Sequence, residues 1–490
     1  MWVDLNQVEQ SPFDGMYDVC VCGSGPAGMA TAQKLIQQGA RVLLLEAGGM
    51  EITAESQAVY QGESVGPQTY YGIEGCRLRY FGGTSNHWTG RCGVFDPLDF
   101  EQRPIWSLPG WPIDYDDAYR HLDDALNFLD LKPADINRRE EKDWPRNRFL
   151  PSGYAFSKPT RVGEKFEGAL KSAANADVAI NANVSGVILN ENGSTVTGLT
   201  VQNYNNDQFT VSAKHFVLAF GALENARFLL NARQQNPAAA GTGHDMVGRC
   251  FMEHFGVTLG RFIPINKSFW NRSANLSLNL STNIARTQNI GTAVVTMTSS
   301  GAPAFFGRLA PLRRFNRNMT CSNDFLLGMA RKNDDIVCDG DGLVTTITEQ
   351  VPNTASRVTL NPDQTDQFGT ARLKLDWRIT DQDLKTINGT AQELGKALAE
   401  SGLARLRIPE GLHDGEVELG FHCHQMGTTR MSSTPQHGVV DQQSTVHGIE
   451  NLHIGGSSVF STGGGINPTL TIVALALRLG EHLGKKLGLS

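Results

Sequence analysis

A glycine-rich segment near the N-terminus carries the first residues whose types and spacing could do chemistry. Gly23, Gly25 and Gly28 lie in the sequence GSGPAG. This motif follows an apolar run at residues 17–22, and Glu46 closes the next apolar run. Glycines let the backbone approach a pyrophosphate, a helix N-terminus offers it free N–H groups, and an acid at this spacing accepts hydrogen bonds from ribose hydroxyls. The pattern predicts a dinucleotide site, and its alternative is an incidental tight turn.

Polar residues also gather in two segments near the C-terminus. The first, HQMGTTRM, begins at His424, and a second histidine, His422, lies two residues earlier. The second, GGSSVFSTGGGINPTLTIVALA, places Asn467 directly before Pro468 and a long apolar run. Proline is favoured in the first turn of a helix, so a helix should open at Pro468. A neutral imidazole near pH 7 is a suitable proton acceptor, so both histidines are candidate bases.

The elements that must position these residues follow from the hydrophobic pattern. Residues 17–22 predict a buried strand, residues 29–39 a helix that ends at a glycine, and residues 40–48 a second strand. Together with the glycine motif they predict one βαβ unit. Residues 50–80 are polar and glycine-rich, which favours an extended connection lying across a ligand over a packed element.

Two later regions predict the rest of the architecture. Residues 178–201 predict two strands around an Asn-Gly turn, and residues 215–232 predict a buried strand running into a helix, so the nucleotide-binding sheet resumes there. From about residue 255 to residue 418, strand-like segments rich in Thr, Val and Asn accompany one clear helix at 381–401. This pattern is consistent with an antiparallel sheet that carries a helix, and it marks the candidate substrate domain.

Length and composition exclude several classes of protein. The chain has 490 residues, which is longer than a single hydrophobic core usually supports, so we expect more than one core. Its net charge is −7, and it has no basic run that would attract nucleic acid. The N-terminus lacks the basic start and apolar stretch of a signal peptide, and no later run approaches ~20 apolar residues, so we expect a cytoplasmic protein without a membrane partner. The eight cysteines show no repeated metal-ligand spacing, so we expect reduced thiols and no metal site.

With these motifs the chain resembles the glucose-methanol-choline (GMC) oxidoreductase family, and within it the branch of pyranose oxidases and other sugar and glycoside oxidases. The resemblance rests on GSGPAG with LLLEAGG, on GGTSNHW at 82–88, on HQMGTTRM and on the glycine-rich segment before the last helix. EQVPNTASRVTL supports it in the middle of the chain. Several separated motifs in one order are more specific than a single motif. The resemblance implies bound FAD and oxidation of a C–OH group.

The fold that follows is an α/β Rossmann-type FAD-binding domain with an inserted α+β substrate domain built from an antiparallel sheet plus helices. The FAD-binding domain is expected to be discontinuous, with FAD where the two domains meet. We expect it to comprise residues 1–100, 160–255 and 419–490, and the substrate domain to comprise residues 101–159 and 256–418.

The resemblance also implies a catalytic pair, His424 and Asn467. Removing a hydride from an alcohol carbon requires that the O–H proton leave as well, so His424 is expected to take that proton while the hydride passes to flavin N5. Asn467 would hold the same oxygen through its amide. The alternative for His424 is a core histidine bonded to backbone. His422 shares its face on an extended segment and is the competing base, but the register of the family motif favours His424.

The residues expected to bind FAD come from several segments that are far apart in the sequence. A similar Thr-His-Trp segment in pyranose oxidase-like members carries a histidine bonded covalently to flavin, so His87 is a candidate for such a link; simple packing of His87 beside the ring is favoured. Val184 is a candidate backbone contact to adenine. The full expected set is Gly23, Gly25, Pro26, Ala27, Gly28, Glu46, Gly82, Gly83, Thr84, Ser85, Asn86, His87, Val184, Gly456, Ser457, Pro468 and Thr469.

The expected substrate is a small alcohol or sugar. The SNHW and HQMGTTRM segments favour a sugar, glycoside or other polyhydroxy compound by analogy, and a hydroxylated secondary metabolite is an alternative. The sequence leaves the electron acceptor, O2 or a quinone, open. A second alternative is a lyase in which FAD is structural. An NAD-linked reductase is disfavoured, since the chain has neither a second glycine fingerprint nor a Cys-x-x-Cys motif.

Five further histidines share no metal-ligand spacing, and we expect them to be surface or structural residues. They are His244, His254, His437, His447 and His453.

Overall fold

The computed structural model describes most of the chain. It describes residues 1–136, 144, 147–237, 244–266, 270, 275–299, 315, 319–321, 323, 326, 341–412 and 419–489. Among the helices in these ranges, none combines the length and the apolar composition needed to cross a bilayer.

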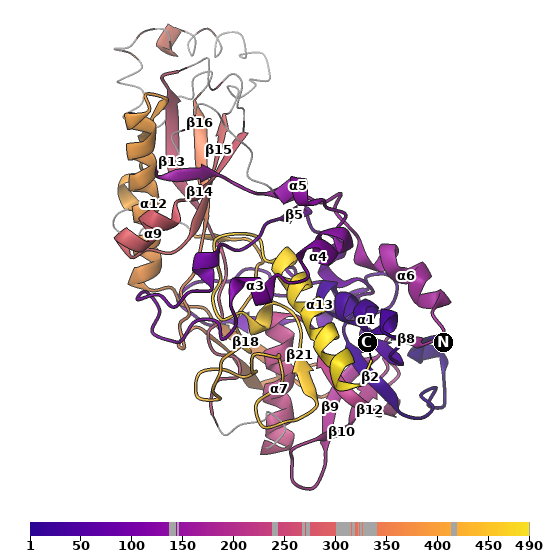
Figure 1. Cartoon of the computed structure of the whole chain (residues 1–490). Coiled ribbons are helices and arrows are strands. Elements are labelled where there is room, and N and C mark those ends of the chain that lie inside the picture. Colours follow the sequence, from indigo (N-terminus) through magenta and orange to yellow (C-terminus); the bar gives the residue numbers. More distant parts are fainter. Residues whose placement is uncertain are drawn as a thin grey trace.

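A six-stranded parallel sheet forms one part of the molecule (Figure 1). Its strands are short runs of almost entirely buried apolar residues, as in sheets that are covered on both faces. Helices α1 (Pro26–Gln37) and α13 (Thr469–Lys486) pack against each other beside it, and Pro468 caps α13 as expected. In spatial order the strands are β1 (Trp2–Asp4), β8 (Ala176–Ile180), β3 (Val42–Leu45), β2 (Tyr17–Cys22), β12 (Ala213–Leu218) and β21 (Leu452–Ile454).

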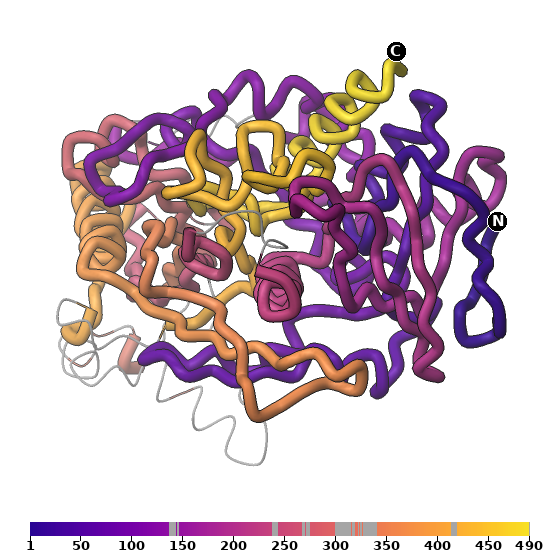
Figure 2. The backbone as a smooth tube through the Cα atoms, turned by 90° about the horizontal axis from the view of Figure 1, so that it is seen from below, coloured from indigo at the N-terminus to yellow at the C-terminus, as the bar shows by residue number. Residues whose placement is uncertain are grey.

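An antiparallel sheet forms the second part, at the upper left of Figure 1. Helix α12 (Asp381–Glu400) packs against it and begins at Thr380, which exchanges capping hydrogen bonds with Asp383. Both chain ends lie on the side of the parallel sheet, away from α12 (Figure 1, Figure 2). The strands are β19 (Ala404–Arg407), β13 (Phe255–Pro264), β16 (Gly342–Thr348), β15 (Ala293–Ser299), β14 (Asn275–Leu280) and β6 (Phe149–Pro151), and β20 (Gly420–Phe421) also pairs with β13.

A smaller sheet and shorter elements complete the fold. A third sheet, antiparallel, packs against β12 through its middle strand. It consists of β11 (Gln208–Val211), β10 (Val196–Gln202) and β9 (Asn183–Leu189). The remaining elements are α2 (Ala54–Ala58), α3 (Tyr115–Ala118), α4 (Leu122–Phe128), α5 (Pro133–Ile136), α6 (Val162–Ser172), α7 (Ala222–Gln235), α9 (Thr282–Gln288), β5 (Arg91–Cys92) and β7 (Ala155–Phe156).

Two local expectations are wrong and one is incomplete. Residues 178–201 form the expected two strands around the Asn-Gly turn, β9 and β10, but they also contain the end of β8, which stops where Asn181 adopts a left-handed conformation (φ 54°). Residues 50–80 contain a packed helix, α2, and a strand, β4 (Gly62–Ser64). That strand pairs with β18 (Ala371–Asp376), which with β17 (Arg357–Thr365) forms a separate sheet against α7 instead of extending the large antiparallel one.

Two hydrophobic cores support the two parts, as the length predicted. One surrounds the parallel sheet and the other the antiparallel sheet and α12. The arrangement confirms a Rossmann-type fold with a second, α+β part, while the residue boundaries of the domains stay a prediction.

The expectation of reduced cysteines holds for the six that are free and fails at Cys321, which is disulfide-bonded. Cys338 lies outside the described residues. A disulfide requires only that two thiols meet in space, and spacing along the chain does not reveal this.

Candidate active site

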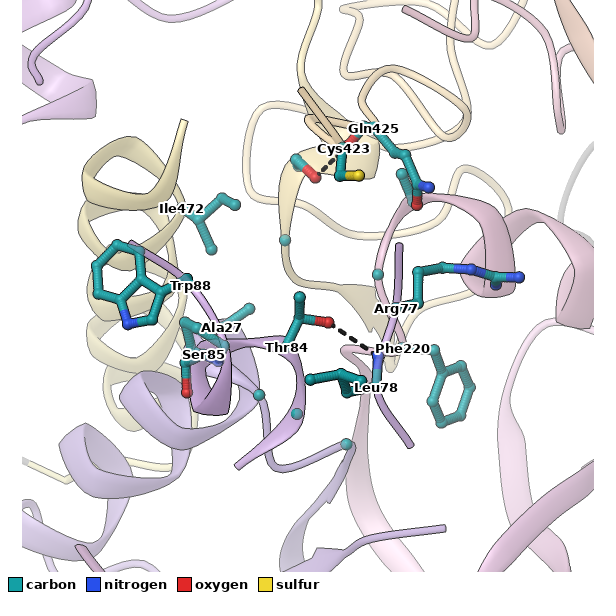
Figure 3. A pocket seen from close by; sticks show the side chains of 18 of the residues that line it. Ala27, Arg77, Leu78, Thr84, Ser85, Trp88, Phe220, Cys423, Gln425 and Ile472 are labelled. Carbon is teal, nitrogen blue, oxygen red and sulfur yellow. Dashed lines mark hydrogen bonds between the residues drawn. The ribbon is translucent and has the colours of Figure 1, made fainter. Parts of the chain in front are cut away.

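A cavity of about 510 Å³ lies at the carboxyl ends of β2, β3 and β12, where ligands bind in open α/β sheets. Figure 3 looks into it, with Trp88 and Ile472 on one side and Phe220 on the other. Its walls come from segments far apart in the chain. They are the loop after β2, the end of β3, residues 75–79 and 83–91, the loop after β12, residues 422–425 and the start of α13.

The glycine motif forms one end of this cavity, and its geometry fits a pyrophosphate. A Cβ at Gly28 would lie 1.8 Å from the carbonyl oxygen of Gly23, so only glycine lets the turn close here. A Cβ at Gly25 would meet nothing within 4 Å, so this backbone faces open space. Gly25 also caps α1 without a side-chain hydrogen bond, which leaves the first N–H groups of the helix for a ligand.

Glu46 lies at the same end and is held in a fixed position. Its Oε2 accepts hydrogen bonds from the backbone N–H of Ser24 (3.0 Å) and the hydroxyl of Ser24 (2.5 Å), and its Oε1 accepts one from the N–H of Gly48 (3.0 Å). The N–H of Gly82 donates to the Ser24 hydroxyl (2.9 Å), so the loop at 82–88 is tied to the βαβ unit. The open glycine turn and the fixed acid match what a dinucleotide requires.

Most of the expected cofactor residues line the cavity. Gly28, Gly82 and Asn86 do not line it. Gly28 packs against the backbone of Gly23, and Gly82 packs against the backbone of Gly163. The Asn86 amide donates to the carbonyl oxygen of Phe81 (2.8 Å). Val184 lines a neighbouring cavity of about 50 Å³. Those that line the main cavity are Gly23, Gly25, Pro26, Ala27, Glu46, Gly83, Thr84, Ser85, His87, Gly456, Ser457, Pro468 and Thr469.

His424 and Asn467 meet at the other end of the cavity, although 43 residues separate them. The Nδ2 atom of Asn467 lies 3.0 Å from Nε2 of His424. Burial lowers the pKa of His424 well below its usual value, and the neighbouring charges of His254, His422 and Arg91 lower it further. His424 is therefore neutral at pH 7.

A chain of hydrogen bonds decides which nitrogen of His424 carries the proton. Nε2 of His254 lies 3.0 Å and 2.8 Å from the carbonyl oxygens of Gly463 and Gly464, which can only accept, so this nitrogen bears the hydrogen. Burial lowers the pKa of His254 to about 4, so the ring is neutral and its Nδ1 is bare. That atom lies 2.9 Å from Nδ1 of His424, which must donate. Nε2 of His424 is therefore the bare nitrogen, aimed at Asn467.

Glu253 anchors the backbone of both histidines. It is fully buried, and its Oε1 accepts hydrogen bonds from the N–H groups of His254 (2.9 Å) and His424 (2.7 Å). The Tyr70 hydroxyl donates to its Oε2 (2.7 Å). Burial raises the pKa of Glu253 to about 7, because these hydrogen bonds only partly offset the cost of burying its charge.

The structure corrects the interpretation of His254 as a residue without a part in the site. Its ring is buried and contacts His424 directly. The sequence CFMEHFGV held a signal, since an acid next to a histidine inside an apolar run must find buried partners. His422 lines the cavity and stacks near His424 (ring centroids 5.7 Å apart). His87 also lines it, edge-on to Tyr80.

Comparison with known proteins agrees with this geometry. Residues 352–476 match a GMC oxidoreductase family model, and residues 16–63 match an FAD-binding domain model. The chain is 22% identical to 2-methyl-1,2-propanediol dehydrogenase of Mycolicibacterium austroafricanum, over 96% of this chain and 95% of that protein. It is 21% identical to the fructose dehydrogenase large subunit of Gluconobacter japonicus, over 95% of this chain and 97% of that protein.

The fold has a counterpart among solved structures. Pyridoxine 4-oxidase from Mesorbium loti superposes with a TM-score of 0.57 at 16% identity, over 95% of this chain and 99% of that one. The ordered motifs, the cavity that fits a dinucleotide and these matches lead to one assignment. Residues 352–476 are those of a GMC oxidoreductase, and the chain is an FAD-dependent enzyme that oxidises hydroxyl groups.

Proposed function

We propose that the protein oxidises a C–OH group of a sugar, glycoside or other polyhydroxy compound, with His424 as the base. One observation carries the proposal: a neutral imidazole inside the cavity presents a bare Nε2 next to an amide donor 3.0 Å away. When bound, FAD supplies at N5 the acceptor for the hydride that leaves the carbinol carbon. The glycine turn and Glu46 would hold its pyrophosphate and ribose, and the start of α13 would meet its ring.

Asn467 and His424 can together bind the reacting hydroxyl. A substrate O–H that enters between them donates to Nε2 of His424, and its oxygen accepts from Nδ2 of Asn467. The hydroxyl thus replaces the direct hydrogen bond between the two side chains. It is aligned for loss of its proton before the C–H bond breaks. General-base help of this kind is worth roughly 10²- to 10⁴-fold in rate.

His254 supports the proton transfer. Once Nε2 of His424 takes the proton, the ring is a cation in a buried site, and burial disfavours it. The bare Nδ1 of His254 accepts from Nδ1–H of that cation and so offsets part of the cost. The ring also cannot rotate without losing this hydrogen bond, so Nε2 stays aimed at the substrate.

The chemistry of the relatives supports a polyhydroxy substrate. One is named for oxidation of a diol and the other for oxidation of fructose. Polar side chains, those of Thr89, Arg91 and Gln425, are among those that line the cavity holding His424. We propose O2 or a quinone as the acceptor of the second half-reaction, and either one would be identified by comparing oxygen consumption with quinone reduction.

A spectroscopic panel tests this proposal. FAD-loaded protein is mixed without oxygen with sugars, glycosides, polyols and simple monoalcohols, and the flavin absorbance band is followed. We expect bleaching with at least one polyhydroxy compound and little with monoalcohols. Fast bleaching by monoalcohols alone would contradict the substrate class. Bleaching by no member of the panel would contradict the proposed oxidation of polyhydroxy compounds and favour the lyase alternative.

A further inference from the structure

Arg91 stands out among the cavity residues because of its charge and its place. It lies on β5 and lines the cavity near His422 and His424. Burial and, after it, the positive charge of Arg91 lower the pKa of His422, and Arg91 also contributes to the lowered pKa of His424. A cation therefore faces the end of the cavity where the substrate hydroxyl would bind.

The contacts of Arg91 hold it in place without neutralising it. The guanidinium carbon lies 3.6 Å from the centre of the Tyr154 ring, and Nη2 donates to the hydroxyl of Thr296 (3.2 Å). The Nε atom is buried and has no hydrogen-bond partner. Within the described part of the chain, no carboxylate oxygen lies within 4.0 Å of Arg91.

Several buried arginines of this protein have carboxylate partners, whereas the buried Arg430 donates to backbone carbonyl oxygens. Arg77 pairs with Glu224 (2.6 Å), and Arg227 pairs with Asp366 (2.5 Å). Removing a guanidinium from water without an anion is costly, so buried charges are paired as a rule. An oriented arginine that lacks an anion and faces a ligand cavity is therefore matched to a charge on the ligand.

We propose that Arg91 binds a carboxylate on the substrate, so that the compound oxidised at His424 is a hydroxy acid such as a sugar acid. This inference rests on the proposed function. One unpaired cation balances one monoanion, and the planar guanidinium matches the planar carboxylate. Arg91 acts in binding and specificity and does not touch the proton that His424 removes.

Matched substrates test the inference. Glucose is compared with glucuronate, and galactose with galacturonate, in the wild type and in the Arg91→Met, Arg91→Lys and Arg261→Met variants. Arg261 is an exposed arginine on β13 outside the cavity wall, so its variant controls for loss of one charge. We expect kcat/KM to favour the acids at least tenfold in the wild type and in Arg261→Met. In Arg91→Met the preference for the acids should vanish, because KM for the acids rises. Arg91→Lys, which keeps the positive charge, should retain part of the preference.

Binding of glutarate, a dicarboxylate without a hydroxyl, separates this inference from the proposed function. Calorimetry should detect glutarate binding to the FAD-loaded wild type and to Arg261→Met, with at least tenfold weaker binding to Arg91→Met. Glutarate binding together with failure of every sugar and sugar acid to bleach the flavin would contradict the proposed reaction and leave the carboxylate site standing. Equal kcat/KM for neutral and acidic sugars, or equal glutarate binding by all variants, would overturn the role of Arg91. A sugar phosphate preferred over the sugar acid would overturn the choice of carboxylate.

Discussion

Nδ1 of His254 and Nδ1 of His424 lie 2.9 Å apart in a buried site, and only one of them can carry a hydrogen. The backbone carbonyls of Gly463 and Gly464 settle the matter, since they require the hydrogen of His254 on its other nitrogen. The loop that begins α13 thus selects, through His254, the nitrogen of His424 that faces the substrate.

Replacing His254 by phenylalanine should slow the reaction without weakening substrate binding. The ring shape is kept, but His424 loses the acceptor that fixes its tautomer and stabilises its cation. We expect kcat of His254→Phe to fall about 10- to 100-fold with a small change in KM. His254→Gln, whose amide can both accept and donate a hydrogen bond, should recover part of the lost kcat. Steady-state kinetics measure both. A His254→Phe variant with wild-type kcat would remove His254 from the account.

As pH is lowered, kcat/KM should begin to fall only well below pH 6.5. His424 works in its neutral form, and its lowered pKa means that it becomes protonated only well below pH 6.5. We therefore expect kcat/KM to stay level from pH 7 to below pH 6.5 before it falls. A limb at or above pH 6.5 in the wild type would contradict the buried neutral base.

Stability should depend on pH through His254 in a defined direction. Its pKa is about 4 in the folded protein and 6.5 in the unfolded chain, so between these values the unfolded chain binds more protons. Stability from this group is complete above pH 6.5 and is lost as pH falls toward 4. Between pH 6.5 and 5 the loss amounts to ~2 kcal/mol. Chemical denaturation should show a smaller loss over that interval in His254→Phe, and an equal loss would contradict the prediction.

Two glycine substitutions should separate folding from cofactor binding. Gly28→Ala places a Cβ 1.8 Å from a backbone oxygen, so we expect misfolded or strongly destabilised protein. Gly25→Ala meets no protein atom within 4 Å, and its backbone faces the cavity, so this variant should fold with a normal melting temperature but lose FAD. The ratio of flavin to protein after gel filtration measures this. Full FAD content in Gly25→Ala would mean that the phosphates bind elsewhere.

Removing Glu253 should disturb the two histidines together. Glu253→Ala leaves the N–H groups of His254 and His424 unpaired in a buried place, at about 1–3 kcal/mol for each group. Glu253→Gln keeps one oxygen for both N–H groups and serves as the matched control. We expect a clear loss of melting temperature and kcat in Glu253→Ala and a mild one in Glu253→Gln. Equal losses in the two variants would show that the charge of Glu253, not the anchoring, matters.

The sequence predicted the parts of the site that lie in local motifs. The glycine turn, Glu46, His424 and Asn467 were found because strand, turn and helix signals surround each of them, and the structure brings all of them to one cavity. The resemblance to a family supplied the pairing of His424 with Asn467, which spacing alone does not give.

The sequence did not predict what depends on long-range packing. His254 lies 170 residues before His424, and only the antiparallel pairing next to β13 brings the two rings together. Arg91 lies in no motif that the sequence analysis used, and only the fold places it against Tyr154 and the cavity. The pairing of β18 with β17 and β4 was missed for the same reason, since strand patterns carry no record of the partner strand.

The most direct test of the account is the rate of anaerobic flavin reduction in His424→Ala, compared with the wild type and with His437→Ala. His437 is an exposed histidine outside the cavity wall and controls for loss of an imidazole. With the best substrate of the panel, we expect the rate constant to fall roughly 10²- to 10⁴-fold in His424→Ala, with full FAD content, and to stay unchanged in His437→Ala. An FAD-loaded His424→Ala variant that reduces its flavin at the wild-type rate would contradict the assignment of His424 as the base.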